Sequence, residues 1–184
     1  MQHKKVTNKD PIKPRILACD PSFTAWGWVV LEGHCPRAQG VIVTKPDNKK
    51  KKIRASEDNA RRVREIVQQL DRIIEKYHVT YIVSEMPHGS QNYKGAVMIG
   101  VVTGILEGFN VLRNIPVEWY LENDAKRALF GRISASKDQV KAAVSDLYEV
   151  YWTGVKYADE AVADALAIYY AAECHSPTIK FMSK

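Results

Sequence analysis

The sequence predicts an α/β domain built on a five-stranded mixed sheet, in which an antiparallel meander of three strands precedes parallel strands and helices cover both faces. Two observations support this. The first quarter of the chain holds three short apolar runs separated by turn residues, and two later apolar runs each follow a stretch with helical periodicity. Because strand–helix–strand connections are right-handed crossovers, the later strands should run parallel to the first.

The meander is predicted from short apolar segments and the turns between them. Strands are expected over residues 15–20, 27–31 and 39–43. Pro21-Ser22 and Glu32-Gly33 supply the turn signals, and both dipeptides are rich in residues that favour reversal of the chain. These three segments should therefore pair in sequence order.

A helix, a strand and a second helix are expected next. Residues 56–77 place apolar side chains at helical spacing, and Ser56 suits the N-cap position. Residues 80–85 form an apolar run typical of a buried strand. Residues 95–112 are mostly apolar and small, with glycines at positions 95, 100, 104 and 108, close to helical spacing. This pattern indicates close packing, chiefly on the sheet, with a helix-to-helix or dimer contact as the alternative.

The remainder of the chain is expected to hold one more strand, over 116–120, and helices over 123–130, 136–151 and 159–174. The predicted domain organisation is a disordered basic lead over 1–14, a single domain over 15–175 and a flexible tail over 176–184.

The N-terminus lacks the apolar segment of a secretory signal, and no uninterrupted apolar stretch suggests a membrane span. Three cysteines without metal-type spacing fit reduced thiols. We therefore expect a cytoplasmic protein without membrane contact.

The charge of the chain favours a polyanionic partner. It has 27 Lys and Arg against 21 Asp and Glu, a formal net charge of +6. The densest basic tract leads into the first predicted helix, and its candidate DNA contacts are Lys49, Lys50, Lys51, Lys52, Arg61 and Arg62. A solvated loop would look the same, whereas contact with phosphates would make binding sensitive to salt.

Three carboxylates, far apart in the chain, are predicted to meet at one edge of the sheet. Asp20 ends the first strand, Glu85 ends the fourth, and Asp164 lies in the last helix. Mg²⁺ prefers oxygen ligands, and two ions bridged by a carboxylate can support phosphodiester hydrolysis. Each acid alone could be a turn residue or a cap. Three of them in a basic chain predict a metal-dependent nuclease.

The motifs over residues 15–175 resemble those of the RuvC-type Holliday-junction resolvases, which have the ribonuclease H-like fold. The likeness is carried, in chain order, by Ile16-Leu17-Ala18-Cys19-Asp20-Pro21 with Gly27, by Glu85 with Gly100 and Gly104, by Lys126, Gly131, Ser134, Lys137 and Gln139-Val140, and by Asp164-Ala165-Leu166-Ala167.

The resemblance implies an endonuclease that resolves four-way junctions and related branched DNA. It also implies two Mg²⁺ ions per active site, with Mn²⁺ as a substitute. A junction has two-fold symmetry, so a symmetric cut implies a C2 homodimer. The resemblance suits a bacterial protein or a phage-encoded one made in an infected host cell. The sequence does not identify a helicase partner.

The resemblance also assigns roles to single residues. Asp20 would bridge the ions, and Glu85 and Asp164 would each complete a metal shell. Lys137 would offset the negative charge that develops at the scissile phosphate. Lys126 would contact phosphate or cover the edge of the sheet.

The sequence departs from the family pattern at two positions. His88 stands where the family has an aromatic residue that wedges into the DNA junction, so His88 is a further candidate DNA contact. Ala161 stands where the family has an acid or a histidine one helical turn before the last Asp. Glu160 is the candidate fourth ligand, with Asp159 nearby. Two alternatives follow: a ribonuclease H-type nuclease that uses the same carboxylates on RNA–DNA hybrids, and a catalytically inactive binder of branched DNA.

Overall fold

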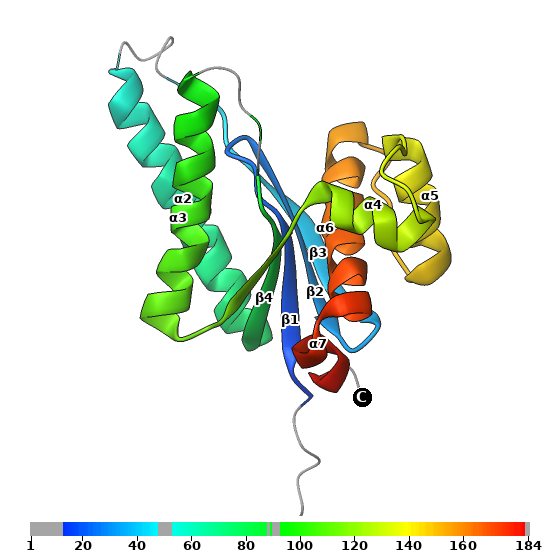
Figure 1. Ribbon diagram of the computed structural model, residues 1–184. Coiled ribbons are helices and arrows are strands. Elements are labelled where there is room, and N and C mark those ends of the chain that lie inside the picture. The colour runs from blue at the N-terminus through cyan, green and yellow to red at the C-terminus, as the bar shows by residue number, and fades with distance from the viewer. Residues whose placement is uncertain (1–12, 48–52, 88, 90–92, 183–184) are drawn as a thin grey trace, which may run out of the picture.

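A computed structural model describes residues 13–47, 53–87, 89 and 93–182. Its centre is one five-stranded sheet with the strand order β3-β2-β1-β4-β5 (Figure 1). The strands span Arg15–Asp20 (β1), Ala25–Glu32 (β2), Cys35–Val43 (β3), Val79–Glu85 (β4) and Val117–Tyr120 (β5). β2 is antiparallel to β1 and β3, whereas β4 is parallel to both β1 and β5. The predicted fold class is therefore confirmed.

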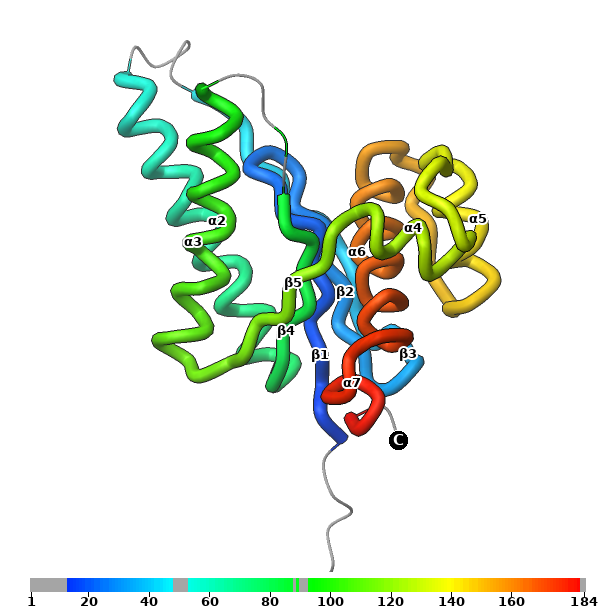
Figure 2. Tube along the Cα trace, viewed as in Figure 1, coloured from blue at the N-terminus to red at the C-terminus, as the bar shows by residue number. Residues whose placement is uncertain are grey.

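The helices divide between the two faces of the sheet (Figures 1 and 2). α2 (Ala55–Tyr77) and α3 (Tyr93–Arg113) cover one face. The other face carries α4 (Glu122–Phe130), α5 (Lys137–Leu147), α6 (Lys156–His175) and the short α7 (Pro177–Met182).

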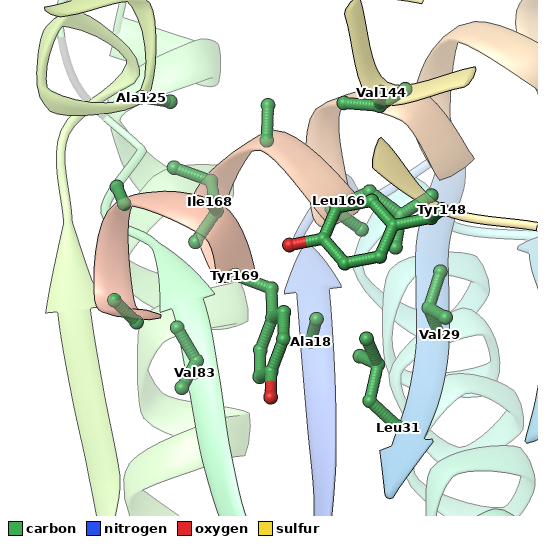
Figure 3. Packing of buried hydrophobic residues seen from close by; sticks show 14 of the residues in the cluster. Ala18, Val29, Leu31, Val83, Ala125, Val144, Tyr148, Leu166, Ile168 and Tyr169 are labelled. Carbon is green, nitrogen blue, oxygen red and sulfur yellow. The ribbon is translucent and has the colours of Figure 1, made fainter. Parts of the chain in front are cut away.

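α6 lies directly on the sheet because most of its buried positions are small. Leu166, Ile168 and Tyr169 pack over Ala18 and its neighbours on the strands, while alanines fill much of the rest of the interface (Figure 3). The closest approach is at Gly27 of β2, where a Cβ atom would lie 2.2 Å from the carbonyl oxygen of Ala161. Only glycine at this position allows α6 to lie so deep, and this depth brings Asp164 toward the end of β1.

α3 differs from expectation in its glycines. The helix is 21 residues long, and an 18-residue window within it is apolar enough, with a mean hydropathy of 1.7, to cross a membrane by length and composition alone, as core helices of soluble proteins also are. Its glycines do not pack on the sheet, since a Cβ at Gly100, Gly104 or Gly108 would have no neighbour within 4 Å. The face that packs on the core is formed instead by larger residues, namely Val102, Ile105, Leu106 and Phe109.

The end of the chain is also more ordered than predicted. The flexible tail expected from Ser176 instead contains α7, in which Ile179 is fully buried. Ser176 Oγ accepts a hydrogen bond from Ile179 N at 3.2 Å and donates one to Glu118 at 2.8 Å. These bonds attach α7 to the sheet. Most of the predicted basic lead, over 1–14, lies outside the described residues.

Candidate active site

Two of the three predicted carboxylates end neighbouring parallel strands. Cys19 of β1 pairs with Ser84 of β4, so Asp20 and Glu85 follow side by side at one edge of the sheet. We call this the carboxyl edge. α6 packs across β1 and β4 and contributes the third carboxylate, Asp164. The structure thus brings together the three acids that the sequence predicted.

These acids interact strongly enough to change their ionisation. Burial raises the pKa of Asp20 well above its usual value, and the negative charges of Asp164 and Glu85 raise it further. Burial also raises the pKa of Asp164, although the charge and hydrogen bond of Lys137 partly oppose this effect. The carboxyl edge therefore concentrates negative charge in a partly desolvated place, where a cation is favoured.

Lys137 forms an ion pair with one of these acids, Asp164. Ser136 caps α5 by accepting a hydrogen bond from Gln139 N at 3.2 Å, which makes Lys137 the first helical residue. From there its Nζ atom lies 2.5 Å from Oδ2 of Asp164. Burial lowers the pKa of Lys137, but the charges of Asp164 and Asp20 outweigh burial and raise it overall. Lys137 is thus held in its charged form.

A fourth acid, Glu122, was not identified from the sequence. It lines a small pocket together with Glu85, Lys126 and Asp164, and its charge acts on both Asp20 and Asp164. Its Oε1 atom lies 2.7 Å from Nζ of Lys126, one helical turn further along α4. A sequence signal existed: Glu122 closely follows β5, which is a third parallel strand ending at the carboxyl edge.

Asp159, considered beside Glu160 as a ligand, has a structural role. It is 3% exposed and accepts hydrogen bonds from Lys141 at 2.8 Å and from the backbone and hydroxyl of Thr153 at 2.8 and 2.7 Å. Burial alone would raise the pKa of Asp159, but these hydrogen bonds lower it to about 2. Asp159 thereby fixes the loop before α6. α5 ends at Leu147, earlier than residue 151 as predicted.

Glu160 and Ala161 occupy different surroundings. Glu160 is near enough to Asp164 for its charge to raise the pKa of that acid, and it lies 3.8 Å from Lys156, one turn earlier in α6. Ala161 is buried against Gly27 and offers no donor atom. Glu160 therefore remains a candidate metal ligand, whereas Ala161 packs against β2.

The donor set suits a hard divalent cation. Within the described ranges, no three Asp, Glu, His or Cys side chains already converge around one point as a complete metal cluster. The acids at the carboxyl edge nevertheless offer only oxygen atoms, the ligands that Mg²⁺ and Mn²⁺ prefer. A cation would relieve the repulsion that raises their pKa values, so the residues present fit such a metal.

The residues predicted to contact DNA differ in their burial and in their partners within the protein. Arg62 is only 7% exposed: it donates hydrogen bonds to Thr44 Oγ1 and to the carbonyl of Phe23, both at 2.9 Å, and stacks on the Phe23 ring. Its guanidinium group anchors α2 to the end of the meander and does not form a DNA-facing surface. The prediction of a DNA contact at Arg62 therefore conflicts with its position.

Arg61 is more exposed than Arg62 but is bound to Asp58, Glu65 and the carbonyl of Lys45. Lys49, Lys50, Lys51 and Lys52, as well as His88, lie outside the described residues. Their predicted contacts with DNA remain predictions.

Comparison with known proteins links this geometry to one family. A family profile described as "Crossover junction endodeoxyribonuclease RuvC" matches residues 16–175. The chain is 31% identical to the crossover junction endodeoxyribonuclease RuvC of Granulibacter bethesdensis over 166 residues, which covers 88% of this chain and 84% of that protein. The protein of the same name from Chlamydia abortus is 31% identical over 128 residues, covering 69% of this chain and 74% of the relative.

Solved structures show the same fold at lower sequence identity. Thermus thermophilus RuvC in complex with a Holliday junction substrate superimposes with a TM-score of 0.70 at 20% identity, over 90% of this chain and 96% of that one. The yeast mitochondrial Holliday junction resolvase gives a TM-score of 0.61 at 15% identity, over 94% and 83% of the two chains.

Proposed function

The chain belongs to the RuvC family of crossover junction endodeoxyribonucleases, and from this premise we propose that Asp20, Glu85 and Asp164 form the centre with which it cuts four-way DNA junctions. The observation that carries the assignment is the meeting of these acids at the carboxyl edge, where burial and the charges of Asp164 and Glu85 raise the pKa of Asp20. Family membership favours this function over a hybrid-specific nuclease or an inactive binder.

We assign the divalent cations to these same carboxylates. When bound, two Mg²⁺ ions would activate water and stabilise the attacking and leaving oxygens of a phosphodiester displacement. Asp20 lies at the end of the central strand β1 and interacts electrostatically with both other acids, which suits a bridging ligand. Mn²⁺ offers a similar preference for oxygen and should substitute.

We assign Lys137 to the scissile phosphate. It is about half-exposed, and its ion pair with Asp164 keeps it charged beside the acids. A fixed ammonium group here can offset the negative charge of the phosphate and of the transition state. Lys126 is less exposed and pairs with Glu122, so we assign it a supporting part in the same electrostatic network.

A symmetric cut requires two sites, and we place the homodimer contact on α3. α2 and α3 line an apolar groove that includes Val67, Val101, Gly104, Gly108 and Leu112. Leu112 is 85% exposed, and the glycines leave the helix surface open. A helix without side chains at these positions lets a partner backbone approach closely, so the same face of a second copy fits here.

The deciding experiment uses labelled four-way junctions with the purified protein. We expect paired nicks in Mg²⁺ or Mn²⁺, none in EDTA, and none with Asp20→Asn, which should still bind junctions. A linear duplex and an RNA–DNA hybrid of the same sequence are the matched substrates. Cleavage of the hybrid in preference to the junction would overturn the proposal, as would full activity of Asp20→Asn.

A further inference from the structure

We propose that Glu122 is a fourth carboxylate of the metal centre, delivered from the start of α4. The inference rests on the proposed function, because it concerns the same cations. It adds to the site a residue outside the acids that the sequence motifs identified.

The position of Glu122 follows from the order of the parallel strands. Tyr120 of β5 pairs with Glu85 of β4, so the chain leaves the sheet beside Glu85. Leu121 then caps α4, and Glu122 is its first residue. The geometry that places Asp20 and Glu85 at the carboxyl edge thus places Glu122 there as well.

The surroundings of Glu122 are those of a site residue. It lines the same pocket as Glu85 and Asp164, and its side chain is 37% exposed, so one side of the carboxylate faces the protein. Its Oε1 atom lies 2.7 Å from Nζ of Lys126. A carboxylate has about four acceptor positions on two oxygens, so it can hold this lysine and a cation together.

The other nearby acids are less suited to this role. Asp159 is committed to Lys141 and to the loop before α6. Glu160 lies 3.8 Å from Lys156, and its charge raises the pKa of Asp164 less than that of Glu122 does. Among the described acids, Glu122 is the one that shares a pocket with both Glu85 and Asp164.

A fourth acid has a clear chemical use here. Two cations about 3.5–4 Å apart need ligands on both sides of the bridging carboxylate. Asp164 approaches from α6, whereas Glu85 and Glu122 approach from the ends of β4 and β5. Glu122 adds a carboxylate beyond Glu85, on the β5 side of the carboxyl edge.

The test measures metal binding without DNA and without turnover. Mn²⁺ is titrated into metal-free protein, and free Mn²⁺ is followed by electron paramagnetic resonance. We expect Glu122→Gln to weaken Mn²⁺ binding by about tenfold or more, as ligand-shell changes commonly do. The matched control is Asp124→Asn on the same helical turn, because Asp124 bonds Leu121 N at 2.9 Å and does not line this pocket. It should bind Mn²⁺ as the wild type does.

Two further variants separate failure of this inference from failure of the proposed function. If Asp20→Asn weakens Mn²⁺ binding and Glu122→Gln does not, the inference about Glu122 is wrong while the metal centre stands. If neither variant changes binding, the metal centre itself is wrong. Weaker binding in Glu160→Gln with no effect of Glu122→Gln would give the fourth position to Glu160.

Thermal melts establish that each variant is folded before titration. If Glu122→Gln does not fold, Glu122→Asp serves in its place, because it keeps the charge and shortens the reach. Wild-type Mn²⁺ affinity in that variant would then overturn the proposal.

Discussion

Gly27→Ala tests the link between helix packing and catalysis. The added Cβ would lie 2.2 Å from the carbonyl oxygen of Ala161, whereas ordinary contact begins at 3.4 Å. The difference means that α6 must move by about 1.2 Å, because the obstructing atom belongs to the backbone and has no rotamer to change. Asp164 lies one turn further along α6 and would move with it.

The expected losses follow from this displacement. A misplacement of about 1 Å in a catalytic constellation can reduce the rate by about 10²-fold. Overpacking of this kind costs about 1–3 kcal/mol of folding free energy, which corresponds to a melting temperature lower by about 2–12 °C for a domain of this size. Junction cleavage should therefore fall far more than the folded fraction does at 25 °C.

The assay is single-turnover junction cleavage at saturating Mg²⁺, with melting followed by circular dichroism. Gly40→Ala is the matched control: the atoms nearest to its added Cβ belong to the Trp28 side chain, the first at 2.9 Å, on the opposite face from α6. It should lose some stability and keep its cleavage rate. If Gly27→Ala cleaves at the wild-type rate, α6 does not set the geometry of the site.

Asp20→Asn should raise the melting temperature of the metal-free protein at neutral pH. Burial and Asp164 raise the pKa of Asp20 in the folded state, so wild-type stability falls as pH rises from about 4 through that folded pKa; equal melting of the two proteins from pH 4 to 8 would contradict this. Asp159→Asn should cost about 3 kcal/mol by leaving Lys141 without its buried partner, while folded molecules cleave normally. The pKa of Asp159 is about 2, so its stabilising effect should be present above pH 4 and fade between pH 4 and 2 in urea titrations. Replacing the four lysines at 49–52 by alanine should flatten the dependence of log K on log salt by up to about 0.9 per lost phosphate contact, and an unchanged slope would make that tract a solvated loop.

The sequence was sufficient to predict the sheet because local signals and topology agree. Apolar runs of strand length alternate with helical stripes, and right-handed crossovers leave few ways to connect them. Asp20 and Glu85 were predictable for the same reason, since parallel strands end at a common edge. Asp164 was less firmly determined, and the family motif supported it, because helical periodicity alone does not say which turn of α6 passes that edge.

The features that the sequence did not reveal depend on distant partners. Arg62 looks like part of a basic surface, but Phe23 and Thr44, far away in the chain, supply the ring and acceptors that bury it. Asp159 looks like a candidate ligand until the loop at Thr153 is seen to fold back onto it. In both cases the charge is recognisable in the sequence, while its partner is set by tertiary structure.

Ala161 affects both the packing of α6 and the set of ligands available to the metal centre. Its small side chain and the missing side chain of Gly27 allow α6 to lie against β2, and Gly27 is the strand partner of Asp20. This contact requires a small side chain at position 161, which has no atom that could bind a metal. The same contact brings Asp164 to the carboxyl edge. Another element can then supply a further ligand: β5 is the remaining parallel strand that ends at this edge, and Glu122 follows directly beyond the N-cap residue of α4.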